Sequence, residues 1–139
     1  MTVTFTRRYK FSASHRLDCE ALSPQENRDV YGKCNNPHGH GHNYRLEVSV
    51  SGPVDRATGM VINMADLDAL VGQSVVERFH LANLNVDPLF QKEVPTTENL
   101  CRAIHRLLTG SLPAGKLDRI RIEETENNFF EYAGEVALG

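Results

Sequence analysis

The sequence of 139 residues has no tryptophan, only three cysteines, and no excess of basic side chains. None of its apolar runs approaches the roughly 20 residues that a membrane-spanning helix needs, and its first residues lack the apolar segment of a signal peptide. Its 15 basic and 18 acidic side chains give a formal net charge of −3, without the basic surface that nucleic acids require. We therefore expect neither a membrane nor a nucleic acid as partner.

The cysteines are odd in number and follow no disulfide spacing. We expect Cys19, Cys34 and Cys101 to be reduced thiols in a cytoplasmic protein. Apolar residues make up 40% of the chain and charged residues 24%, which is typical of a globular protein. No linker or repeat divides the chain, so we expect one domain over residues 1–139.

Hydrophobic periodicity predicts four strands and two helices. Their expected order is strand 3–15, strand 44–50, a helix capped by Asn63, a helix capped by Thr96 or Thr97, strand 117–126 and strand 129–132. The stretches 16–41 and 80–95, rich in proline, glycine and polar residues, are expected to be loops. Paired strands with helices on one face make an α+β domain.

Three histidines fall at matching positions of the first two strands. His40 and His42 share parity with Tyr44, so both imidazoles point to one face, and His15 ends the first strand on its apolar side. Antiparallel pairing would bring them together. Three neutral imidazoles with an open fourth position are the ligands of a catalytic zinc site, although a His-x-His pair alone is more often unrelated to metal. His38 shares the parity and is the rival ligand.

Cys34 lies in the loop six residues before His40. It can be a proton-transferring base, a fourth metal ligand, or a loop thiol without a role. A cysteine beside Lys33 and near a dication would have a lowered pKa, which favours a thiolate that acts as a base. Cys101 is expected to pack in a helix.

Glu124 shares parity with Ile120 and Ile122, which puts a carboxylate on the buried face of a strand. Such burial is unfavourable unless the charge has a partner. The alternation can lapse at the strand end, an arginine can pair with the carboxylate, or the carboxylate can anchor a ligand. An aminopyrimidinone ring such as a pterin presents two adjacent N–H groups, which one carboxylate can accept together.

Residues 32–44, GKCNNPHGHGHNY, closely resemble the signature of the 6-pyruvoyl-tetrahydropterin synthase family. The resemblance continues through 58–61 (TGMV), 96–99 (TTEN) and 124–128 (ETENN), in the right order along nearly the whole chain. The 6-carboxy-tetrahydropterin synthases of queuosine biosynthesis belong to the same superfamily. The resemblance implies a tunnelling fold, in which ββααββ subunits join their sheets into a β-barrel, usually as a hexamer of two trimers.

The resemblance also implies a zinc-dependent lyase that eliminates triphosphate from 7,8-dihydroneopterin triphosphate with internal proton shifts. Carried over by position, His15, His40 and His42 are the zinc ligands, Cys34 is the catalytic base, and Glu124 anchors the pterin in a pocket lined by Thr96, Thr97 and Glu98. Arg16 and Lys33 are candidates for triphosphate binding because they are cationic and near the site.

One part of the family pattern is missing. An Asp-His pair is expected where this chain has His80 and Leu81, and leucine cannot exchange a proton. We predict that His80 reaches the site through a one-residue shift and acts as the second proton carrier. The alternatives are a 6-carboxy-tetrahydropterin synthase, which releases acetaldehyde from the same substrate, and a pterin-binding homologue with altered or lost turnover.

Overall fold

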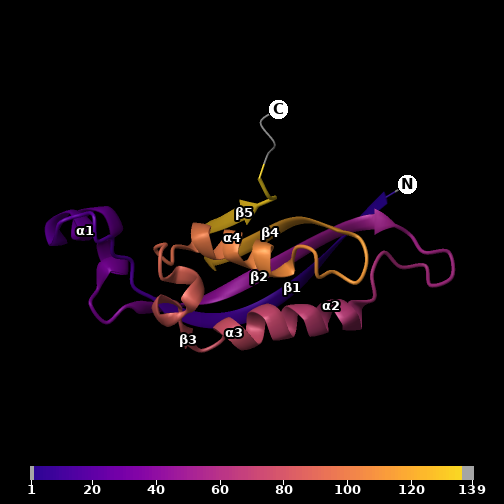
Figure 1. Cartoon of the computed structure of the whole chain (residues 1–139), viewed down its shortest axis with the longest axis horizontal. Helices are drawn as coiled ribbons and strands as arrows, with labels where there is room; N and C mark the ends of the chain where they lie inside the picture. Colours follow the sequence, from indigo (N-terminus) through magenta and orange to yellow (C-terminus); the bar gives the residue numbers. More distant parts are fainter. Residues whose placement is uncertain (1, 136–139) are drawn as a thin grey trace.

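A five-stranded sheet in the order β3-β1-β2-β4-β5 forms the centre of the computed structural model, which describes residues 2–135 (Figure 1). The strands are β1 (Thr2–His15), β2 (His40–Pro53), β3 (Ala82–Asn83), β4 (Lys116–Thr125) and β5 (Asn128–Tyr132). The α-helices are α1 (Pro24–Tyr31), α2 (Met64–Val71), α3 (Glu77–Phe79) and α4 (Thr97–Leu108). Short 3-10 turns are η1 (Gly32–Asn35), η3 (Leu84–Val86) and η4 (Pro88–Phe90), and η2 (Gly72–Val76) is a π-helical turn. The predicted α+β class is confirmed.

The two long strands β1 and β2 pair antiparallel over their whole length, from Thr2 opposite Pro53 to His15 opposite His40. On β1 the inward side chains become fully buried toward His15. On β2 they are fully buried from Tyr44 to Val50, while His40 and His42 are partly buried. Arg7 interrupts the apolar face of β1, and Asp68 of α2 compensates for it through two hydrogen bonds of 3.1 and 3.0 Å. The strand register therefore decides which side chains meet at the buried end.

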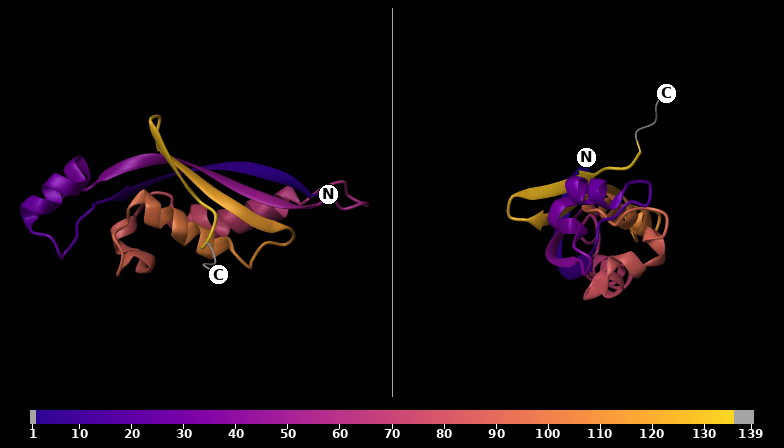
Figure 2. Two further views of the ribbon diagram at one scale, coloured as in Figure 1. Left: turned by 90° about the horizontal axis from the view of Figure 1, so that it is seen from above. Right: turned by 90° about the vertical axis from the view of Figure 1, so that its left-hand side faces the viewer.

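Helices α2, α3 and α4 cover one face of the curved sheet, as the end-on view of Figure 2 shows. The α2–η2–α3 segment begins at Asn63, whose side chain accepts from the Asp66 amide, and α4 begins at Thr96, whose hydroxyl accepts from the Asn99 amide. The core joins the inner face of the sheet to these helices and includes Leu46, Val48, Ile120, Ile122, Leu67, Val71, Leu100 and Ile104. Both predicted helices and their caps are thus confirmed.

The prediction that 16–41 and 80–95 are loops is wrong in part. The first contains α1 and η1, and the second contains β3, which pairs parallel with β1, together with η3 and η4. Helix α1 has a capping box, in which Ser23 and Glu26 each bond the other's backbone amide, and Pro24 occupies its first turn. It lies at one end of the molecule, beyond the sheet (Figures 1 and 2).

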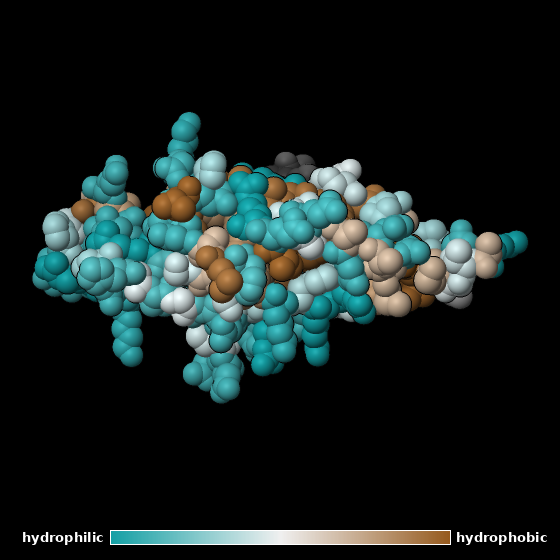
Figure 3. All heavy atoms as spheres, turned by 90° about the horizontal axis from the view of Figure 1, so that it is seen from below, coloured by the Kyte–Doolittle hydropathy of each residue, from teal (hydrophilic) through white to brown (hydrophobic). Residues whose placement is uncertain are grey.

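Over residues 2–135, no helix is both long and apolar enough to cross a bilayer. Figure 3 shows the molecule from below: hydrophilic side chains dominate this face, and a few apolar patches interrupt them. Cys19, Cys34 and Cys101 are free thiols, as predicted. Cys101 is buried in α4, where its Sγ donates to the Phe130 carbonyl.

Candidate active site

The three predicted histidines lie together where β1 ends and β2 begins. Their ring centroids are 5.0 Å apart for His15 and His40, 5.1 Å for His15 and His42, and 4.6 Å for His40 and His42. His15 and His40 are opposite each other in the register, and His42 follows on the same face. The Nε2 atoms of His40 and His42 are 2.8 Å apart.

His15 is held in one orientation by the backbone. It is only 1% exposed, and its Nδ1 lies 2.8 Å from the Pro95 carbonyl oxygen. Because a carbonyl only accepts, Nδ1 carries the proton and Nε2 keeps a lone pair. Burial lowers the pKa of His15, which favours the neutral ring. Its Nε2 is buried and has no partner among the described residues.

These donors fit a divalent metal ion. One ligating atom from each of His15, Cys34 and His40 lies within 4.8 Å of the others. Burial also lowers the pKa of His42, so this ring too favours the neutral form that metals bind. A cation would occupy the unused His15 lone pair, and the carbonyl on its Nδ1 is the usual outer partner of a metal-bound histidine. Imidazole nitrogens with a nearby thiol are the donor set that zinc prefers.

Gly39 lets the chain enter β2 close against β1. Its φ is +70°, and a Cβ added there would lie 2.9 Å from the His15 carbonyl oxygen. Only glycine combines this backbone conformation with so close an approach. The glycine therefore helps to set the spacing of His15 and His40.

Cys34, in η1, has its Sγ 3.6 Å from His40 Nε2. Burial raises the pKa of this thiol, and the charge of Glu124 adds to the rise. Lys33 is exposed and does not offset the rise. Lys33 is not among the groups that shift this pKa, so the lowering expected from Lys33 is not seen, and the lowering expected from a nearby dication stays a prediction.

Glu124 occupies a bulge in β4, between Glu123 and Thr125, which changes the register with β5. Bulges often redirect a side chain beside an active site. Here the carboxylate is 15% exposed, one oxygen accepts from the Thr97 hydroxyl, and the other lies 3.8 Å from His42 Nε2. Its charge therefore adjoins the histidine cluster.

The other residues predicted to line the pterin pocket differ in placement. Thr97 is 1% exposed and contacts Glu124. Thr96 uses its hydroxyl as the N-cap of α4, and Glu98 is exposed in the first turn of that helix. Only Thr97 of the three directly contacts the carboxylate through its side chain.

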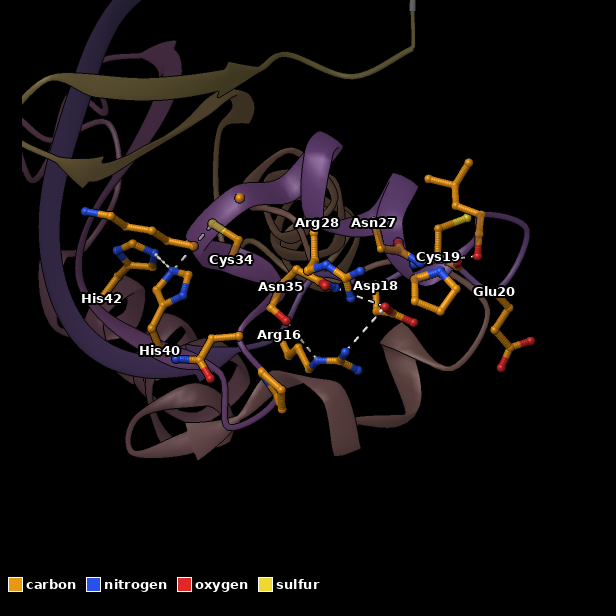
Figure 4. A pocket seen from close by; sticks show the side chains of 16 residues that line it. Arg16, Asp18, Cys19, Glu20, Asn27, Arg28, Cys34, Asn35, His40 and His42 are labelled. Carbon is orange, nitrogen blue, oxygen red and sulfur yellow. Dashed lines mark hydrogen bonds and ion pairs between the residues drawn. The ribbon is translucent and has the colours of Figure 1, made fainter.

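A cavity of about 940 Å³ opens beside the cluster. Figure 4 shows His40, His42 and Cys34 at one end, Arg16 and Asp18 in the middle, and Cys19 with Glu20 at the other end. Arg16 is partly neutralised by Asp18 at 3.5 Å, and Lys33 also lines the wall.

His80 is hydrogen-bonded elsewhere. Its Nδ1 accepts from the Ser12 amide at 3.1 Å, and the Leu81 amide donates to the Ser12 carbonyl at 2.6 Å. Leu81 has a φ of 61° and is 81% exposed. His80 itself is exposed and does not line the cavity beside Cys34. His80 and Leu81 are thus hydrogen-bonded to the backbone of Ser12 in β1.

Three further contributors to the site went unrecognised in the sequence. Pro95 acts through its carbonyl, which no sequence pattern reveals. Gly39 acts through its close approach to the His15 carbonyl oxygen, a contact that emerges only in the fold. Tyr44 marked the parity of β2, and the structure shows its buried hydroxyl near Thr97 and Glu124.

Fold and site together define the class: an α+β protein whose sheet carries a histidine and cysteine cluster of the kind that metalloenzymes use, beside a buried carboxylate. The chain belongs to the 6-pyruvoyl tetrahydropterin synthase family, whose family model matches residues 4–135.

Two kinds of relatives agree with this assignment. The chain is 47% identical to 6-pyruvoyl tetrahydrobiopterin synthase of Homo sapiens over 131 residues, covering 94% of this chain and 90% of that one. It is 45% identical to the protein of the same name from Dictyostelium discoideum over 135 residues, with 96% and 98% covered. The structure of Caenorhabditis elegans 6-pyruvoyl tetrahydropterin synthase superposes with a TM-score of 0.92 at 39% identity, covering 97% of both chains.

Proposed function

We propose that this protein is a zinc-dependent lyase that converts 7,8-dihydroneopterin triphosphate into 6-pyruvoyl-tetrahydropterin with release of triphosphate. The observation that carries the proposal is the convergence of His15, His40, His42 and Cys34 in a member of this family.

His15, His40 and His42 would hold the zinc ion. When bound, zinc supplies a Lewis acid that polarises substrate oxygens and acidifies neighbouring C–H groups. The Pro95 carbonyl keeps the His15 Nε2 lone pair available for the ion. Cys34, whose Sγ lies 3.6 Å from His40 Nε2, is the proposed base, a role that the family resemblance implies for this position.

Glu124 would bind the pterin ring. A carboxylate that accepts the ring N–H and the exocyclic amino group together fixes both the position and the plane of the ring. Thr97 holds one carboxylate oxygen and thereby orients the group. Thr96 and Glu98, at the start of α4, complete the proposed pocket wall.

His80 is the proposed second proton carrier. Ser12 occupies its Nδ1, so in the neutral ring Nε2 carries the proton. The side chain is exposed, which leaves that N–H free to exchange. Leu81 has no group that could take this role.

We further propose that residues 1–139 act as one domain in a cytoplasmic homo-oligomer, a hexamer of two trimers with its sheets joined into a barrel. The edge position of β5 supports this, because an edge strand leaves backbone groups available to a second chain. The three free thiols agree with a reducing compartment.

A product assay with purified, zinc-loaded protein tests the function. Incubation with 7,8-dihydroneopterin triphosphate should release triphosphate and form 6-pyruvoyl-tetrahydropterin, and Cys34→Ala should slow both by about two to four decades. Acetaldehyde among the products would instead identify 6-carboxy-tetrahydropterin synthase activity. Pterin binding without any Cys34-dependent product would identify a binding protein that has lost turnover. His40→Ala should lose its zinc. The His38→Ala variant is its matched control, since within residues 2–135 the His38 side chain makes no hydrogen bond to His15, His40 or His42.

A further inference from the structure

Tyr44 of β2 carries a buried hydroxyl without a partner. The residue is 1% exposed, and its Oη makes no hydrogen bond within residues 2–135. A phenylalanine would fill the same space without leaving a polar atom unsatisfied. An unsatisfied buried group calls for an explanation, and here its location suggests one.

The hydroxyl lies close to Glu124, the proposed pterin anchor. The ring stacks on Phe11 with centroids 5.2 Å apart, and the His42 ring follows at 5.6 Å. Burial raises the pKa of the Tyr44 hydroxyl, the charges of Glu124 and Cys34 add to the rise, and a long hydrogen-bonding approach of the Thr97 hydroxyl opposes it. Thr97, Glu124 and Cys34 are therefore its polar neighbours.

The hydrogen-bonding groups of Tyr44 and Thr97 match: Tyr44 lacks an acceptor for its hydrogen, and Thr97 Oγ1 can still accept one. The Thr97 hydroxyl has one hydrogen, which it donates to Glu124, and it keeps acceptor capacity on Oγ1. Tyr44 has a hydrogen to donate and no acceptor in hydrogen-bonding geometry. A small adjustment of these side chains would join them in the sequence Tyr44 to Thr97 to Glu124.

We propose that Tyr44 is a positioning residue for the pterin anchor: its hydroxyl donates to Thr97 Oγ1 when the ring is bound, and so holds the Glu124 carboxylate in the plane of the ring. This inference rests on the proposed function and deepens it. A carboxylate can make two parallel bonds to a ring edge only in one orientation. Each hydrogen bond in such a chain polarises the next, so the Tyr44 hydroxyl strengthens the bond from Thr97 to Glu124.

The test is binding of unsubstituted pterin, which has the ring but no side chain to reach the metal. Affinity is measured by quenching of pterin fluorescence in zinc-loaded protein. Tyr44→Phe should bind about tenfold more weakly, the size of one hydrogen bond in a charged network. Its zinc content should be unchanged, because the proposed ligands are untouched.

Tyr9→Phe is the matched control. Tyr9 lies on the neighbouring strand, and its hydroxyl donates to Asp68 at 2.8 Å, away from Glu124. This variant should lose thermal stability and keep its pterin affinity. Tyr44→Phe should keep its thermal stability, because removing an unpartnered hydroxyl breaks no native hydrogen bond, and it should lose pterin affinity.

A double-mutant cycle with Thr97→Val separates positioning from a direct contact. If Tyr44 acts through Thr97, then Tyr44→Phe should cause no further loss of affinity in the Thr97→Val protein. Equal affinity of Tyr44→Phe and the parent, or additive losses in the cycle, would overturn the inference and leave the proposed function standing. A parent protein that does not bind pterin would overturn both.

Discussion

Gly39 offers a direct perturbation of the site through the backbone alone. Alanine at this position meets two penalties: a left-handed φ of +70° and a Cβ that would lie 2.9 Å from the His15 carbonyl oxygen. The first costs about 1–2 kcal/mol. The second requires a shift of backbone, and overpacking of this kind costs about 1–3 kcal/mol more. We expect Gly39→Ala to be destabilised by about 2–5 kcal/mol in total.

Gly59→Ala isolates the first penalty. Gly59 has a φ of +73° but nothing within 4 Å of an added Cβ, and it lies in the turn beyond the far end of β2. Alanine there should cost only the backbone term, about 1–2 kcal/mol. The Tm of Gly39→Ala should therefore be about 3–12 °C below that of Gly59→Ala, for a chain of this length.

Zinc content distinguishes a damaged site from a merely less stable protein. Because the shift at Gly39 displaces the His15 backbone against His40, Gly39→Ala should lose most of its zinc, whereas Gly59→Ala should keep it. Zinc per chain is measured by mass spectrometry of metal on dialysed protein at a temperature where both variants are folded. Equal zinc content and equal Tm in the two variants would refute the role given to this glycine.

Three other predictions concern single side chains. Cys34→Ala should lower kcat by about two to four decades, as for a lost general base, while pterin affinity and zinc content stay near those of the parent; full activity would exclude the thiol as the base. His80→Ala should lower turnover by a similar factor of about two to four decades, and an effect below about threefold would remove His80 from the mechanism. Arg7 and then Tyr9, through their hydrogen bonds, lower the pKa of Asp68. The ionised Asp68 carboxylate therefore stabilises the fold fully above the ordinary carboxyl pKa, and this contribution is lost as pH falls through the lowered pKa. The difference in unfolding free energy between the parent and Asp68→Asn should shrink in acid. A difference that grows in acid would contradict this prediction.

The alternation of inward and outward side chains along each strand predicted on which face the three histidines lie. This alternation can be read from the local sequence alone. His15, His40 and His42 each follow from counting along an alternating strand whose apolar face must be buried. The inward side of Glu124 followed from the same count, although the bulge that shapes its surroundings did not. The pairing of β1 with β2 then brought these residues together.

Features that depend on tertiary contacts could not be predicted in the same way. Helix α1 is short, polar and distant from the sheet, so it lacks the apolar stripe that reveals α4, and its one local signal, the capping box of Ser23 and Glu26, went unrecognised in the sequence. The Pro95 carbonyl on His15 and the Ser12 amide on His80 join segments far apart in sequence. The family pattern drew attention to His80 but gave no sign of its bond to the edge of β1.

The zinc content of the purified protein compared with its His15→Ala variant tests the central claim most directly. The account predicts about one zinc ion per parent chain and almost none in the variant, because the buried Nε2 of His15 is removed from a three-imidazole site. Retention of full zinc by His15→Ala, or no zinc in a parent protein that turns over its substrate at full rate, would contradict it.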